Sequence, residues 1–443
     1  MDFEFNPIEI DRVLRRAQHS WLAWAQRDRS LDTEESDEHP LAAYRSVTSQ
    51  ALFRRIGEMP DSDPLREPLR RWVFRLSEQR IDQATLNALA SERAKEHRPS
   101  DAPGRQAVSF GLMLKRALGD APRRQQWAKL LLEHAPPVSA RSVELWQRRR
   151  EIARRMGLAH PGEIEAPLPD AASVAEGLSK VTRERVRELG LGSLSALFEA
   201  AVGAEVPGAW PARLSPQRLL DFFRDSDLLR SLELRVAPLP SSFGAASTCR
   251  ALGLLGAGWF EALAPHDQPF VVAHDPYGLG RHQAAALFAL LPLNARFARR
   301  HLEVSQHGLP DAQRRLAQLW LLDLAGMAFR VRLRQAALAS ERAFREAFSE
   351  LANSDLALSL PENAAGAVFE LGIEDEQALL GRLTAVARAD ELIEAHDEDW
   401  FRNPRAIEQL RAEARRPPAT QADPAHVERS LALVTKRLEQ LLR

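Results

Sequence analysis

The sequence of 443 residues lacks several of the features on which particular classes of protein depend. It has one cysteine, Cys249, so the chain can form neither an internal disulfide nor a cysteine-rich metal site. The net charge of −1 gives no overall attraction to nucleic acid or to an anionic membrane. No apolar run of about 18 residues is free of charged residues, so we expect no membrane-spanning segment.

Two further absences concern the N-terminus and lysine. The first residues, MDFEFNPIEID, are acidic and no apolar run follows a basic segment, so we expect no secretion signal. Together with the single cysteine, this predicts a protein of the reduced cytoplasm. Only five of the 60 basic residues are lysine, and the arginines are spread over the whole chain. Arginines spread in this way indicate solvated helix faces, because a phosphate-binding surface would need them clustered on one face. We therefore expect no nucleic-acid or membrane partner.

The residues that are present are typical of a folded globular protein, with 45% hydrophobic and 27% charged side chains. The dominant spacing of the apolar residues is helical. One stripe at steps of three and four comprises Ile10, Val13, Ala17, Trp21 and Trp24. Such a stripe predicts an amphipathic helix near the N-terminus.

A second helix is expected from Ser139 to Gly157, where glycine is the usual left-handed cap. Strand-like patterns are scarce: LELRVAP (Leu232–Pro238) alternates apolar and polar residues, and PFVVAHD (Pro269–Asp275) is a short β-branched run. The sequence therefore predicts a mainly α-helical fold with at most a small β-sheet.

Turn-rich segments divide the chain into a helical region (1–138), a central helical domain (139–416) and a linker with a final amphipathic helix (417–443). Apolar residues of the final helix alternate steps of four and three, at Val427, Leu431, Val434, Leu438 and Leu441. This seam is too short for a free coiled coil. We expect the helix to dock on its own chain; the alternative is a contact with a partner or a second copy.

The stretch HDPYGLGRHQAAALF places the polar pair His282 and Gln283 at the start of an apolar helix, behind a turn that contains glycine. In zinc peptidases of the HExxH type, two histidines four residues apart bind the metal from one helical face. The glutamate beside the first histidine takes a proton from the metal-bound water. The corresponding frame here reads His-Gln-Ala-Ala-Ala, ending at Ala286.

Residues 139–416 resemble the oligoendopeptidase and thimet-oligopeptidase type of zinc metallopeptidase, in a divergent form. The resemblance implies a large, two-lobed bundle of helices with a peptide channel between the lobes. It implies a third metal ligand, a glutamate, at the start of the next long helix. The similarity lies in the order of elements along the chain more than in identical residues. These elements are the helix RRREIARRMGL (Arg148–Leu158), the two strand-like runs, the turn HDPYGLG (His274–Gly280), the helix HQAAALFALL and the helix DAQRRLAQLWLL that starts at Asp311.

The departures from this family pattern determine the chemistry that the resemblance implies. His282 matches the first ligand, but Ala286 stands in place of the second histidine and has no electron pair to donate. Gln283 replaces the general base, and a neutral amide does not accept a proton near pH 7. Asp311 keeps a carboxylate on a shorter stem. Because two ligands do not hold zinc tightly, we expect no cofactor and no hydrolysis.

We therefore expect a catalytically inactive, metallopeptidase-like protein that binds a peptide or protein partner in a groove between lobes. One alternative is a zinc-dependent oligopeptidase with a rearranged site built from His274, His282, Asp311 and His301 or His307. The other is a purely structural or interaction protein. Zinc is expected as a cofactor only under the first alternative.

The residues near the turn also have simpler interpretations. His282 can be a helix cap or the partner of a neighbouring carboxylate, which is commoner than a metal ligand. His274 and Tyr277 can line a pocket, although a tyrosine in a turn is more often packed on the surface. Cys249 lies among apolar neighbours, which is typical of a packing residue rather than a nucleophile.

Overall fold

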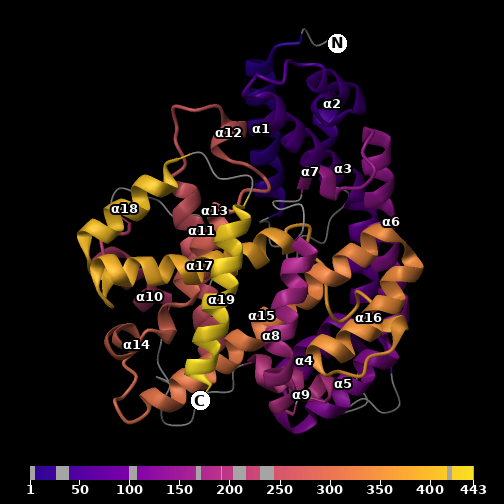
Figure 1. Ribbon diagram of the computed structural model, residues 1–443. Helices are drawn as coiled ribbons and strands as arrows, with labels where there is room; N and C mark the ends of the chain where they lie inside the picture. Colours follow the sequence, from indigo (N-terminus) through magenta and orange to yellow (C-terminus); the bar gives the residue numbers. More distant parts are fainter. Residues whose placement is uncertain are drawn as a thin grey trace.

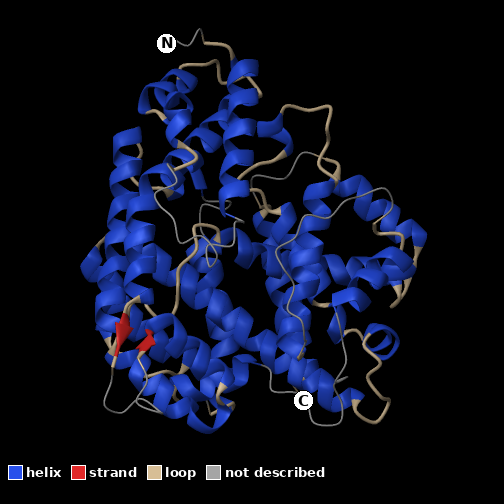
Figure 2. Ribbon diagram, turned by 180° about the vertical axis from the view of Figure 1, so that it is seen from behind, coloured by secondary structure: helices blue, strands red, loops and turns tan. Residues whose placement is uncertain are grey.

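The computed structural model describes residues 5–25, 39–98, 107–165, 171–190, 192–202, 216–229, 244–416 and 422–442. Within these ranges the chain forms nineteen α-helices and one two-stranded sheet (Figure 2). The antiparallel strands β1 (Glu96–His97) and β2 (Val108–Ser109) pair Glu96 with Ser109. The prediction of a mainly α-helical bundle with a small sheet is confirmed. In the described part of the chain, no helix is long and apolar enough to cross a membrane.

The N-terminal helices form the top of the molecule in Figure 1 and have a core of their own. They are α1 (Pro7–Ala25), α2 (Gln50–Gly57) and α3 (Arg66–Ala94). The predicted stripe of α1 is confirmed at Ile10, Val13 and Ala17, which are buried. The long helix α6 (Ala135–Met156) packs along α3 and joins this core to the rest of the molecule.

Helix α6 begins four residues before the predicted start because the two prolines at its N-terminus fit the first helical turn. It ends where expected, since Gly157 has a φ of 86° and closes the helix in the left-handed conformation. The helix runs without interruption past residue 138, so the N-terminal region and the central region share it. The division into three regions stays a prediction.

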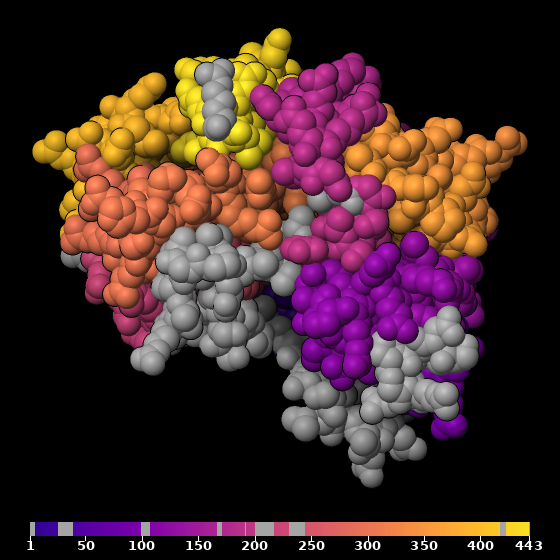
Figure 3. Space-filling view, turned by 90° about the horizontal axis from the view of Figure 1, so that it is seen from below, coloured from indigo at the N-terminus to yellow at the C-terminus, as the bar shows by residue number. Residues whose placement is uncertain are grey.

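Most of the remaining helices form two groups, which lie on the right and the left of Figure 1. The right-hand group comprises α4 (Phe110–Gly119), α5 (Arg124–Glu133), α8 (Ala171–Glu188), α9 (Leu194–Val202) and α16 (Glu341–Leu356). The left-hand group comprises α10 (Pro216–Asp225), α11 (Ala245–Ala262), α13 (Gly280–Ala289), α14 (Ala295–His301), α17 (Asp375–His396), α18 (Pro404–Ala414) and α19 (Pro424–Leu441). Seen from below, the purple segment with α4 and α5 and the salmon segment with α14 lie on opposite sides of the molecule (Figure 3).

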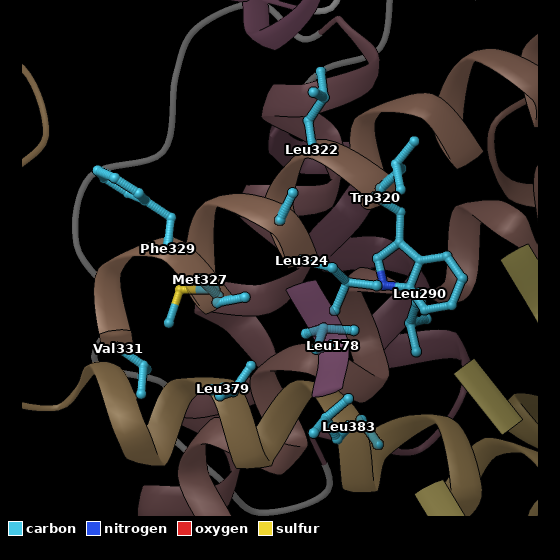
Figure 4. Packing of buried hydrophobic residues seen from close by; sticks show 14 of the residues in the cluster. Leu178, Leu290, Trp320, Leu322, Leu324, Met327, Phe329, Val331, Leu379 and Leu383 are labelled. Carbon is cyan, nitrogen blue, oxygen red and sulfur yellow. The ribbon is translucent and has the colours of Figure 1, made fainter. Parts of the chain in front are cut away.

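The longest helix, α15 (Leu309–Ala339), connects the two groups because it contacts α8 and α16 on one side and α17 on the other. Figure 4 shows the apolar packing around it. Trp320, Leu324 and Phe329 of α15 are buried in the same cluster as Leu178 of α8 and Leu383 of α17. Removal of this apolar surface from water stabilises the arrangement of the two groups.

Helix α13 lies between α11 and α17, and two glycines permit the close approach. A Cβ atom at Gly256 of α11 would lie 2.8 Å from the carbonyl oxygen of Ala284. A Cβ atom at Gly381 of α17 would lie 2.6 Å from the main-chain carbon of His282. Both distances are shorter than van der Waals contact allows, so any larger residue at either position would push the start of α13 away.

Of the expectations for short segments, one is wrong, one is not tested and one is confirmed. The run 269–275 is not a strand: it forms the short helix α12 (Phe270–Ala273), whose backbone turns after Pro269. The other strand-like run, 232–238, lies outside the described residues. The final helix α19 docks on α17 through a buried side that includes Val427, Val434 and Leu438, so its expected packing on its own chain is confirmed.

Candidate functional site

The polar pair of the opening helix lies where α13 meets α17. His282 is in the first turn of α13, and 18% of its side chain is exposed. Its Nε2 atom is 3.4 Å from Oε2 of Glu374, the residue that precedes α17, at an angle that makes no hydrogen bond. His282 thus has a carboxylate neighbour, as its simpler interpretation expects, but it makes no hydrogen bond to it. Burial lowers the pKa of His282, so its ring is neutral near pH 7.

Glu374 is the centre of the charges around His282. One of its oxygens accepts a hydrogen bond from Nη2 of Arg75 at 3.0 Å, and the other pairs with Arg281. Burial opposes ionisation of this carboxyl group, but Arg281, His282 and Arg75 hold its pKa well below the usual range. Glu374 is therefore a carboxylate at every physiological pH.

A cavity of about 450 Å³ opens beside these residues. Its lining residues come from α3, α6, α13, α17 and the segment that precedes α17. Arg75 of α3 and Arg149 of α6 line one side, and His282 with the segment 370–375 lines the other. The Nε atom of Arg149 donates a hydrogen bond to Asp82 at 2.9 Å, which holds its guanidinium in place.

A cluster of buried charged groups packs next to the cavity. Arg334 of α15 has no exposed surface and pairs with Glu165 and Glu376. Glu165 ends α7 (Gly162–Glu165), and Glu376 is in the first turn of α17, so Arg334 ties three helices together. Burial and the nearby Glu165 raise the pKa of Glu78 on α3 well above its usual value.

Tyr277 is part of the same cluster, so the expectation that it packs on the surface is wrong. Its side chain is 1% exposed and lies 3.5 Å from Glu78, to whose Oε2 it donates a hydrogen bond. The turn before α13 carries Tyr277 inward because the amide of that residue donates to the Asp275 side chain at 2.7 Å. Asp275 in turn pairs with Arg71 of α3 at 2.7 Å.

The other predicted positions do not gather around His282. Asp311 lies at the start of α15 with 69% of its side chain exposed, and it pairs with Arg314 at 3.8 Å. His282 thus has Glu374 as its carboxylate neighbour, not Asp311. Ala286 is one turn further along α13 and packs against the hydrophobic core, while Gln283 is half-buried and does not line the cavity.

His274 is directed elsewhere as well. Its backbone carbonyl accepts a hydrogen bond from Nε1 of Trp72 at 2.6 Å, and its ring packs against Phe270. Burial and the charge of Arg15 lower the pKa of His274 to about 4. The ring is therefore neutral, and it does not line the cavity.

The donor set around the cavity does not fit a zinc ion. Zinc sites in proteins take three or four ligands from histidine, cysteine and carboxylate side chains. Among the residues that the structure describes, no group of three or more such side chains could hold a metal ion. His301, a residue of the alternative metal site, packs instead against Phe222, Phe297 and Phe401. The one carboxylate beside His282 is already paired with two arginines, which would repel a divalent cation.

Of the residues around the cavity, the sequence pattern singles out His282 alone. Arg75, Arg149 and Glu374 come from segments far apart in the chain, so no local spacing connects them. The run Glu374-Asp375-Glu376 was the available signal, because acidic residues favour the first turn of a helix. That signal predicts the start of α17 but not the arginines that pair with it.

Comparisons with known proteins extend the description of the fold. No protein-family model matches the sequence, and no curated protein does. Among solved structures, the chain is similar to PZ peptidase A, determined with an inhibitor, with a TM-score of 0.55 and 11% sequence identity. The match covers 98% of this chain and 85% of the peptidase chain. The chain therefore has a peptidase-like fold over nearly its whole length.

Proposed function

We propose that this chain is a peptide-binding protein with the fold of a peptidase that does not hydrolyse its ligand. The observation that carries the proposal is the cavity beside His282, which is lined by arginines and by carboxylates already paired with arginines. A cavity of about 450 Å³ is within the range typical of ligand sites in proteins. The similarity to PZ peptidase A supports a peptide as the ligand.

Hydrolysis of a peptide needs a group that activates water or attacks the carbonyl carbon. A general base works best when its pKa is near the pH of the reaction. Glu374, the carboxylate beside His282, has a pKa far below that range and does not take a proton from water. The amide of Gln283 accepts none either.

The single thiol is equally unsuited to attack a peptide. Burial raises the pKa of Cys249 to about 12, so the residue is a thiol and not a thiolate near pH 7. Cys249 lies on α11 and packs against the hydrophobic core, as expected from its apolar neighbours in the sequence. The loss of metal ligands, base and nucleophile together supports binding without turnover.

The test combines metal content with turnover. The protein is purified without chelators, its zinc is measured, and it is incubated with zinc and a library of fluorogenic peptides. We expect substoichiometric zinc and no zinc-dependent turnover. About one equivalent of tightly bound zinc, with turnover that is lost in His282→Ala, would contradict the proposal and favour the rearranged metal site.

A further inference from the structure

Two arginines that line the cavity beside His282 each have a buried hydrogen-bond donor that no described residue uses. Arg149 is 7% exposed; its Nε donates to Asp82, and its guanidinium lies 4.7 Å from the ring centre of Trp146. Its Nη1 atom is buried and has no hydrogen-bond partner among the described residues. Arg75 donates from Nη2 to Glu374, and its Nη1 is likewise buried without a partner in the described part of the chain.

The acidic residues of the lining do not use these donors, because each is paired with a further arginine. Glu370 pairs with Arg93 at 2.9 Å. Glu374 pairs with Arg281 in addition to Arg75, and Asp375 lies 3.4 Å from Nε of Arg330. Asp375 also accepts a hydrogen bond of 2.9 Å from the backbone of Gly372. Each of these carboxylates thus has an arginine partner that does not itself line the cavity.

A buried guanidinium N–H without an acceptor costs free energy, and a ligand oxygen recovers that cost. A carboxylate is the matching group, because its two oxygens accept from arginine donors in charge-assisted hydrogen bonds. Both arginines are held in place before the ligand arrives, Arg149 by Asp82 and Trp146 and Arg75 by Glu374. Such preorganisation lowers the entropic cost of binding.

We infer that Arg75 and Arg149 bind a carboxylate group of the ligand. The inference rests on the proposed function for the source of that group, which we assign to the free C-terminus of a peptide. A small free carboxylic acid offers the same chemistry from another source. The two sources are separated by the experiment below.

Binding is measured by fluorescence anisotropy with a pool of labelled peptides of random sequence. The same pool is used with a free C-terminus and with an amidated one, and succinate serves as a competitor. The variants are wild type, Arg75→Gln and the control Arg70→Gln. Arg70 is on the same helix and is 23% exposed, but it pairs with Glu67 and does not line the cavity. In Arg75→Gln the carboxylate of Glu374 keeps Arg281 as its partner.

We expect amidation to weaken binding by about tenfold or more, the factor that corresponds to one charge-assisted hydrogen bond. Arg75→Gln should weaken binding of the peptides with a free C-terminus by a similar factor and leave binding of the amidated peptides unchanged. The control Arg70→Gln should change the binding of neither pool. For Arg149 the variant is Arg149→Gln combined with Asp82→Asn, which removes both charges of the pair together. Circular dichroism melts show whether each variant is folded.

The outcomes separate this inference from the proposed function. Equal binding of the free and amidated pools, unaffected by Arg75→Gln, would overturn the carboxylate site and leave peptide binding intact. Binding of succinate that depends on Arg75, without binding of any peptide, would support the site and overturn the peptide as ligand. Binding of neither succinate nor peptide would overturn both.

Discussion

The buried triad around Arg334 gives the most quantitative prediction, because its energetics follow from burial and charge. The substitution Arg334→Met keeps the approximate volume of the side chain and removes its charge. It leaves Glu165 and Glu376, each with 2% of its side chain exposed, without their shared cation. Glu376 keeps a hydrogen bond of 2.8 Å from Gln335.

Breaking a buried ion pair by removal of one partner costs about 3–5 kcal/mol, because the remaining charge is uncompensated. We expect a loss of about 4 kcal/mol in the free energy of unfolding for Arg334→Met. An unfolding entropy of about 2.1 cal/mol/K per residue converts this loss to a decrease of about 4 °C in the melting temperature of a chain of this length. The carboxylates can take up protons, so the loss should be smaller at pH 5 than at pH 8.

The assay is a thermal melt followed by circular dichroism at both pH values. The matched control is the triple variant Arg334→Met, Glu165→Gln and Glu376→Gln, which removes all three charges and should recover most of the loss. An unchanged melting temperature for Arg334→Met alone would refute the reasoning, since it would mean that the two carboxylates do not depend on the guanidinium.

The remaining predictions concern packing, pH and thiol reactivity. Gly381→Val should lower the free energy of unfolding by about 1–3 kcal/mol, because the added side chain overpacks against α13. The control Gly326→Ala should not lower it, since this helical glycine has open space around it. Both variants are measured by urea unfolding. The folded-state pKa of His274 is about 4, below the value of 6.5 for the unfolded chain, so the unfolded chain takes up the proton first as the pH falls. The neutral His274 should therefore contribute at most about 3 kcal/mol to the free energy of unfolding, in full above pH 6.5 and no longer at pH 4. The variant His274→Gln should make the free energy of unfolding less dependent on pH between these values. An equally small pH dependence in the wild type would contradict this prediction. Cys249 should react with a thiol reagent at pH 8 at least about 100-fold more slowly than free cysteine, and fast labelling of the folded protein would contradict its raised pKa.

The elements with a strong period or a defined end were predictable from the sequence. The stripe in α1 and the glycine that ends α6 follow from local rules, and the structure agrees with both. The prediction of a strand at 269–275 is wrong, because β-branched residues over so few positions do not decide between strand and helix. There the chain turns after Pro269 and packs on α1 and α3 as the helix α12.

The site was predictable only in part, for a physical reason. The sequence singles out His282 as a polar residue at the head of an apolar helix. Its charged neighbours, Glu374 and Arg75, are brought to it by the packing of α13 against α17 and of α3 near both. No spacing in the chain encodes those contacts, and the same holds for Tyr277, which the turn carries into the core.

The most direct test of binding without hydrolysis is recovery of the bound peptide. The protein is incubated with zinc and a labelled peptide pool, the complex is isolated by gel filtration, and the bound peptides are identified by mass spectrometry. Our account predicts full-length peptides in the complex and no shortened products after prolonged incubation. Shortened peptides that form only with zinc, and that disappear in His282→Ala, would contradict it.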